Sequence, residues 1–498
     1  MRYLPCVFSG VAMFVWGGLS AVGVAGEPAP LPETVVASSR PLFPDLEQSR
    51  RELDALMAKI DAARPGEGVR PTAMVFGESG ADACRAPACE ERACDEPACA
   101  VPDDPVCGCE GDEPPGLFGY CLHGNDWLSA EYVYTGEVFT NMRGGMDTND
   151  ATRYFGVIDL ALTADLSRFG CLPGGTFFLL AEDFHGRGIT EDFVGDYQTL
   201  SNIDTGRNNM QVSEFWWERS LWDEFLAVRL GKQDANSEFA VVDVGGDFIN
   251  SSFGLPTNIP MPTYPDPALG LIAFFNITDQ LSFKFGLFDG AADGRTWGVS
   301  NTGTLFSIFE FKRTWELCGG LPGDAHVGLW YHNGEFEPPL APTGGNPAFQ
   351  FLQMWSNRGP FHTLAGGAHE GTHGVYMGFE QQLYREPWEV DDVQGLAAFF
   401  QYSWAAEDVN EVPNYFGAGV VYKGLFEGRD EDTLGFGAAY AEFADGTTTR
   451  SAETALELFY KARIGSYICV QPDLQYIIAP GGEYDDAFVA GLRFELVL

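Results

Sequence analysis

From Trp127 to the end of the chain, apolar and polar residues alternate with a period of two in segments of about ten residues, the length of a membrane-crossing β-strand. Successive side chains on a strand point to opposite faces, so this period gives each segment one apolar and one polar face. About sixteen segments show the pattern: 127–137, 153–166, 175–185, 211–222, 224–234, 268–277, 280–288, 304–314, 324–333, 373–386, 392–405, 415–421, 432–443, 451–463, 466–478 and 485–497. The repetition predicts an all-β fold for this part of the chain.

The connections between these segments alternate in length. The short connections include 222–224, 276–280 and 463–466. The long connections are 138–152, 186–210, 235–267, 289–303 and 334–372. If the first strand runs outward, every long connection falls at the same end, as in outer-membrane barrels with short periplasmic turns and long outer loops. We therefore expect a transmembrane antiparallel β-barrel of about sixteen strands over 127–498, because a soluble sandwich has no reason to segregate loop lengths.

The final segment, 485–497, supports the barrel. Its apolar residues Phe488, Leu492 and Phe494 share one face, and the charged pair Arg493 and Glu495 lies on the other. An apolar face toward lipid and a polar face toward the lumen is the pattern of a membrane barrel.

The composition excludes two classes of partner. The chain has 71 Asp and Glu against 29 Lys and Arg, which gives a formal net charge of −42. Such acidity argues against nucleic acid and against anionic lipid as partners. No stretch after residue 25 is apolar for about 18 residues, the length that a membrane-spanning helix needs.

Residues 1–25 are typical of a signal peptide, because Arg2 precedes a mostly apolar run and small residues follow it. A membrane anchor is the alternative, but the run is short. Residues 26–126 are expected to form a periplasmic segment that contains a short helix over 45–63. This helix could form a coiled coil that helps a trimer to assemble or pack singly on the barrel mouth, and fewer than three heptads favour single packing.

Seven cysteines lie within 84–121, and the first four recur every five residues. Dense cysteines in an exported chain indicate disulfides. Zinc binding is the alternative, but zinc sites favour close pairs without the intervening acids and prolines found here. We expect a disulfide-stapled linker, in which the odd cysteine stays free or pairs elsewhere, and neither a metal nor a cofactor.

The connection 235–267 is longer than most loops that have no structure of their own, and such loops are usually functional or disordered. It is not polar enough for disorder, since it carries Phe239, Phe248 and Phe253 and four prolines in its second half. An apolar, stiffened loop is expected to pack inside the barrel and to narrow the lumen as a constriction loop.

Two blocks of sequence carry a resemblance. The first consists of G-K-Q-D at 231–234, F-I-N-S-S-F at 248–253 and Y-P at 264–265, and the second of E-L-F-Y-K at 457–461, Q-P-D-L-Q-Y at 471–476 and G-L-R-F at 491–494. In these blocks the chain resembles the OprB family of carbohydrate-selective porins, over 127–498. The resemblance implies passive diffusion of mono- or oligosaccharides through a bacterial outer-membrane porin, surrounded by lipid as a monomer or homotrimer.

Parity within the expected strands selects the residues that face the lumen. They are Glu131, Asp159, Glu182, Glu214, Trp216, Arg229, Lys284, Trp330, Glu380, Gln475 and Arg493, together with Lys461 and Gln401. Carboxylates, guanidinium groups and amides bond to sugar hydroxyls, and the apolar face of a pyranose fits an indole. The alternative for each charged residue is an ordinary solvated wall position.

The resemblance adds Lys232 and Asp234 to the pore-lining or substrate-binding candidates and gives more weight to Arg229, because these residues lie in or beside the G-K-Q-D block. By parity Lys232 points away from the lumen. It could therefore anchor the loop or extend to the lipid headgroups.

The stretch 369–373 matches the zinc-protease pattern H-E-x-x-H. That chemistry needs a helix, and the surrounding glycines disfavour one. We expect a loop tip that enters a strand, and no enzyme. Two other functions stay open: a non-selective or cation-preferring general porin, and a barrel that anchors another envelope layer.

Overall fold

The computed structural model describes residues 127–169, 174–222, 224–317, 320–336, 369–386 and 394–497. The expected signal peptide, the helix over 45–63 and the cysteines of 84–121 lie outside these residues and stay predictions. No helix within the described ranges combines the length and the apolar character needed to cross a membrane.

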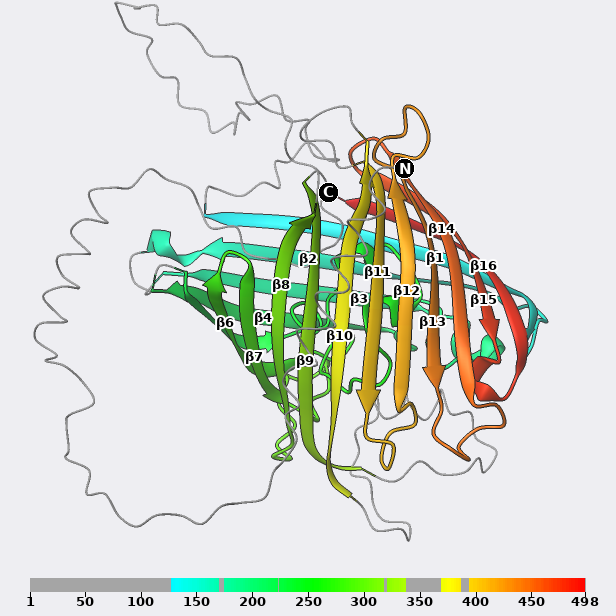
Figure 1. Cartoon of the computed structure of the whole chain (residues 1–498), viewed down its shortest axis with the longest axis horizontal. Helices are drawn as coiled ribbons and strands as arrows, with labels where there is room; N and C mark the ends of the chain where they lie inside the picture. The colour runs from blue at the N-terminus through cyan, green and yellow to red at the C-terminus, as the bar shows by residue number, and fades with distance from the viewer. Residues whose placement is uncertain are drawn as a thin grey trace, which may run out of the picture. The chain divides into compact units, whose positions relative to one another are not determined.

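Sixteen antiparallel strands form one closed barrel, in which each strand pairs with its neighbours in the sequence and β1 pairs with β16. The strands are β1 (Leu128–Gly145), β2 (Thr152–Asp165), β3 (Thr176–Gly186), β4 (Asn209–Leu221), β5 (Leu226–Gln233), β6 (Ala268–Thr278), β7 (Leu281–Asp289), β8 (Leu305–Leu317), β9 (Leu321–Phe336), β10 (His369–Arg385), β11 (Gly395–Ala405), β12 (Asn414–Lys423), β13 (Thr433–Glu442), β14 (Ala452–Ile464), β15 (Ile468–Ile478) and β16 (Asp485–Val497). Figure 1 shows the barrel from the side, with β10 to β14 in front. The predicted fold class and strand number are confirmed.

Within the described residues, five short helical segments lie in the connections. They are η1 (Leu166–Phe169), η2 (Thr190–Val194), η3 (Asp243–Gly245), α3 (Ser251–Gly254) and η4 (Pro480–Gly482). The connections 187–208, 234–267, 290–304 and 337–368 all leave the same end of the antiparallel barrel. The segregation of long and short connections expected from the sequence is therefore present.

Burial follows the two-residue period. On β15, Asp473, Gln475 and Ile477 are buried, whereas the alternate residues Leu474 and Tyr476 are exposed. On this strand the outward row is therefore apolar and the inward row carries polar side chains, as expected of a barrel in lipid.

The expected end of the first strand at residue 137 is wrong, because β1 continues to Gly145. The alternation continues through Phe139 and Asn141, both of which are buried. The Asn141 amide nitrogen donates to the carbonyls of Gly144, at 2.9 Å, and Phe193, at 3.0 Å. Asn141, which the sequence placed in a loop, is thus an inward wall residue that forms its hydrogen bonds with the chain around it.

The apolar core lies inside the barrel. Two clusters combine inward wall residues with residues of the connections 187–208 and 234–267, which we call the β3–β4 loop and the β5–β6 loop. Small wall residues make room for them: a Cβ atom built on Gly437 would lie 2.7 Å from a ring carbon of Phe248. Glycine at this inward position lets the phenyl ring lie directly on the strand.

Candidate functional site

The β5–β6 loop follows β5 and folds into the lumen, where wall side chains on four strands hold its backbone. Three carboxylates accept backbone N–H groups of the loop: Glu310 on β8 accepts from Ala240 at 2.9 Å, Glu380 on β10 accepts from Val244, and Glu457 on β14 accepts from Ile249 and Asn250. In addition, Gln401 on β11 donates to the Phe253 carbonyl at 2.8 Å. The loop therefore crosses the interior from the wall at β8 to the wall at β14.

Asp234 forms hydrogen bonds with the backbone at both ends of this loop. Its Oδ1 accepts the Asn236 N–H at 2.7 Å, and its Oδ2 accepts the Tyr264 N–H at 3.0 Å. Burial raises the pKa of Asp234, and these hydrogen bonds oppose the rise. The last residue of the G-K-Q-D block thus joins the start of the loop to its end.

Four inward carboxylates form what we call the acidic wall: Glu131 on β1, Asp159 on β2, Glu182 on β3 and Glu214 on β4. Asp159 lies directly across from Glu182 in the strand register. Among the described residues, none of the four carboxylates forms an ion pair, since no cationic nitrogen lies within 4.0 Å of them. Asp159 Oδ1 and Glu214 Oε1 are buried and have no hydrogen-bond partner among the described residues.

The cations that the sequence placed inward differ from the acidic wall, because Arg229, Lys284, Lys461 and Arg493 are each paired with a carboxylate. Arg229 lies 2.7 Å from Glu218 and 2.9 Å from Glu238, and Lys284 lies 3.1 Å from Glu310. Lys461 lies 3.0 Å from Asp247 and 3.2 Å from Glu495, and Arg493 contacts Glu137. Charge is therefore locally neutralised on these strands and left uncompensated along the acidic wall. The local field favours cations and hydrogen-bond donors there.

Trp216 and Trp330 face inward, as parity predicts, but they are only 3% and 2% exposed. The Trp216 ring stacks on Phe178, with centroids 4.9 Å apart, and the Arg229 guanidinium lies 4.1 Å from its centroid. Trp330 stacks on Phe306 at 6.3 Å within the apolar core. In this structure both indoles pack the wall and present no free face to a solute.

Lys232 lies on the outward side of β5, as its parity predicts, and it is fully buried. The ammonium group donates to the carbonyls of Val212, at 2.6 Å, of Gly294 and of Thr296, at 3.0 Å. Of the two roles that the sequence left open, the contacts support a loop anchor, but the anchored segment is 290–304 and not the β5–β6 loop. No pattern in the sequence indicates that this segment covers β5.

Replacing Lys232 by methionine is expected to loosen residues 290–304, because three carbonyl groups lose a charged donor. Hydrogen bonds to charged groups contribute about 1.5–3 kcal/mol each, and two of the three carbonyls lie in 290–304, so the docking free energy should fall by about 3 kcal/mol or more. Hydrogen–deuterium exchange should then be faster at the amides of 293–298. Arg295→Met is the control, since Arg295 forms an exposed pair with Asp293 in the same loop. Equal exchange in both variants would contradict the anchor.

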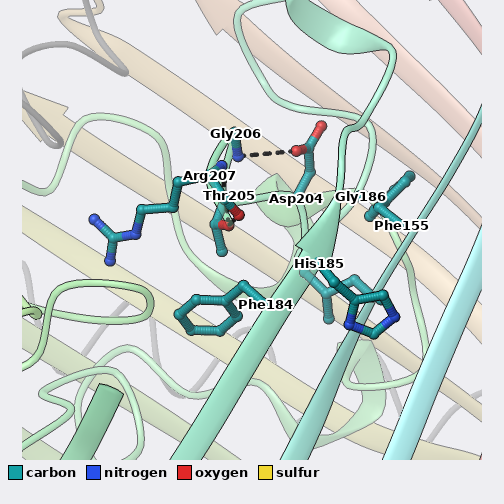
Figure 2. A pocket seen from close by; sticks show the side chains of 10 residues that line it. Phe155, Phe184, His185, Gly186, Asp204, Thr205, Gly206 and Arg207 are labelled. Carbon is teal, nitrogen blue, oxygen red and sulfur yellow. Dashed lines mark hydrogen bonds between the residues drawn. The ribbon is translucent and has the colours of Figure 1, made fainter. Parts of the chain in front are cut away.

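Figure 2 shows a small pocket beneath the β3–β4 loop, lined by Phe184, Asp204 and Arg207. The Gly206 N–H donates to Asp204 Oδ1 at 3.1 Å, and burial raises the pKa of Asp204 to about 6. The pocket volume is about 10 Å³, enough for a single water molecule and too small for a sugar ring. The passage for a solute must therefore lie elsewhere in the lumen.

Parity also pointed to residues that the sequence analysis left out. Glu453 and Glu457 lie on the same face of β14 as Lys461, which the sequence placed inward. Glu137 follows from Glu131 on β1 by the same rule. The signal was present on these two strands, because Glu137, Glu453 and Glu457 lie an even number of residues from an assigned inward position. Glu310 lies on β8, where no inward position was assigned.

The stretch 369–373 begins β10, so the zinc-protease spacing falls on a strand. Among the described residues, no group of three or more His, Cys, Asp or Glu side chains is placed to hold a metal ion. The expected entry of a loop into a strand at this point is confirmed.

Comparisons with known proteins agree with this architecture. A model of the family described as "Carbohydrate-selective porin, OprB family" matches residues 149–498. Porin B of Pseudomonas aeruginosa is 24% identical over 405 residues, which cover 73% of this chain and 86% of that protein. The putative porin QuiX of Acinetobacter baylyi is 21% identical over 421 residues, which cover 73% and 89%.

A solved structure of Pseudomonas putida OprB at high pH aligns with a TM-score of 0.64 at 23% identity, covering 75% of this chain and 94% of that one. This alignment shows a shared fold. Because the family model spans more than half of the sequence, the chain belongs to the OprB family of carbohydrate-selective porins, and its barrel lies in the outer membrane of a Gram-negative bacterium.

Proposed function

We propose that sugars diffuse passively through this barrel between the acidic wall and the two inner loops, with no coupling to an energy source. The observation that carries the proposal is the acidic wall, in which Glu131 is exposed and none of the four carboxylates has a cationic partner among the described residues. Sugar hydroxyls are neutral donors, and an ionised carboxylate is a stronger acceptor than a neutral group. The acidic wall thus offers acceptors that no cation of the described chain occupies.

The exposed residues of the inner loops support the same path. Asn202, Asp243, Gly246 and Gly254 are the exposed members of stretches that are otherwise largely buried. A Cβ atom at Gly254 would meet nothing within 4 Å, so open space adjoins the loop there. Small and polar residues along this edge would let a hydrated solute pass with weak contacts. Weak binding is required, because the solute must leave as well as enter.

A cation-preferring channel is the second candidate, and the uncompensated charge of the acidic wall favours it. Both functions can coexist, since a neutral sugar and a small cation use the same carboxylates differently. The reversal potential in a gradient of potassium chloride measures the cation preference directly. A reversal potential near zero would mean that the excess Asp and Glu residues of the chain do not line the conducting path.

The test is conductance of the purified protein in planar bilayers, titrated with glucose, maltose and longer maltodextrins. We expect the ion current to fall with sugar concentration and to saturate. Glu131→Gln should weaken the block, whereas Glu442→Gln, on the outward face of β13, should leave it unchanged. Current that no sugar alters would contradict a luminal sugar site.

A further inference from the structure

The β3–β4 loop and the β5–β6 loop are bonded to each other inside the barrel. The Asn202 N–H donates to the Ile249 carbonyl at 2.8 Å, and the Ser251 N–H donates to the Thr199 carbonyl at 3.1 Å. These main-chain bonds join segments that lie about 50 residues apart in the sequence. Movement of one loop away from the lumen would therefore break backbone bonds of the other.

Both loops also bind one strand of the wall. Glu453 on β14 accepts the N–H groups of Tyr197, at 2.7 Å, and Gln198, at 2.9 Å. Four residues later on the same face, Glu457 accepts the N–H groups of Ile249, at 2.7 Å, and Asn250, at 2.9 Å. The two carboxylates are 0% and 1% exposed, so water does not compete for their oxygens.

Gln475 on β15 lies directly across from Glu457 in the strand register and contacts both loops. Its Nε2 donates to the Leu200 carbonyl at 2.8 Å, and its Oε1 accepts from Asn250 Nδ2 at 3.1 Å. The β5–β6 loop has a further tether here, since Lys461 lies 3.0 Å from the Asp247 carboxylate.

We propose that Glu453, Glu457 and Gln475 are positioning residues that hold the two inner loops as a single constriction unit, so that neither loop alone sets the width of the pore. Each carboxylate places one oxygen on each of two adjacent peptide N–H groups. A glutamine in its place would retain one acceptor and point an NH₂ group at the second N–H. Amide substitution is therefore nearly isosteric but removes the double contact.

The experiment compares Glu453→Gln, Glu457→Gln and the double variant by single-channel recording and by exclusion of neutral polyethylene glycols of graded size. Each single variant should raise the ratio of undocked to docked loop about tenfold or more, as loss of a charge-assisted hydrogen bond implies. A wider conductance level should then be occupied more often, and larger polymers should enter. If the loops form one unit, both single variants should populate the same wider level, and the double variant should raise the ratio about a hundredfold, the product of the two single effects.

Glu483→Gln is the matched control. Glu483 accepts the Thr449 N–H at 2.9 Å and the Thr449 hydroxyl at 2.6 Å, so it has the same chemistry, but its own hydrogen-bond partner lies outside both inner loops. A different wider level in each single variant, with both levels present in the double variant, would show that the loops move separately and would overturn the single unit. Unchanged conductance and polymer exclusion would show that the two carboxylates do not hold the loops. If Glu457→Gln prevents folding, Gln475→Met tests the same coupling. The inference concerns pore width alone, so a channel without sugar block would leave it intact.

Discussion

Replacing Arg493 by methionine is expected to destabilise the barrel by about 3–5 kcal/mol, the typical cost of removing one partner of a buried ion pair. Arg493 on β16 lies across from Glu137 on β1, where the barrel closes. The two side chains form an ion pair in which Glu137 is fully buried, and Arg493 also donates to Asn202 of the β3–β4 loop. Loss of the guanidinium would leave the Glu137 carboxylate buried without a counter-charge.

Unfolding by urea in lipid vesicles, followed by the mobility shift between folded and heated protein on gels, would measure the change. The double variant Arg493→Met with Glu137→Gln is the decisive control, because it removes both charges. We expect it to recover most of the lost stability. Equal destabilisation of the single and double variants would contradict a charge-pair role and would indicate that Arg493 acts through packing.

Replacing Phe248 by alanine is expected to release the β5–β6 loop from the wall and to widen the pore. The Phe248 ring lies 4.4 Å from Phe253, 4.9 Å from Phe459 and 5.6 Å from Phe399 between centroids. Truncation of a buried phenylalanine costs about 3–5 kcal/mol, and here the loss falls on loop docking. Single-channel conductance and the polymer size limit should both rise.

Phe309→Ala is the control for this prediction, because Phe309 on β8 is 41% exposed on the outward face and removes the same atoms. It should leave conductance unchanged. If Phe248→Ala lowers stability without altering conductance or exclusion, the β5–β6 loop does not set the width of the pore, and the constriction must lie elsewhere.

The sequence predicted the barrel well because one physical signal repeats in every strand. A bulge shifts this period on β4, where the register changes opposite Leu180 and Ala181 and the adjacent residues Ser213 and Glu214 are both buried. Strand ends were less certain. Polar residues such as Asn141 satisfy their hydrogen bonds inside the barrel, and local composition does not separate such a residue from a loop residue.

The candidate site was predictable only in part. Parity gives the direction of a side chain, so the inward positions of Asp159, Glu182 and Arg229 followed from it. What covers a side chain depends on loops that return from distant parts of the chain. The burial of Trp216 and Trp330 and the cover over Lys232 arise from such contacts, and no pattern within a single strand indicates them.

The acidic wall also bears on which sugars the porin would favour. A fixed row of negative groups excludes mobile anions from the water beside it, as a cation-exchange resin does. Uronic acids and sugar phosphates would therefore be depleted in the lumen relative to neutral hexoses of equal size. The depletion should fade as salt shortens the Debye length from about 30 Å at 0.01 M to about 10 Å at 0.1 M. At low ionic strength, the charge of a carbohydrate would therefore affect its passage through the barrel more strongly than its shape.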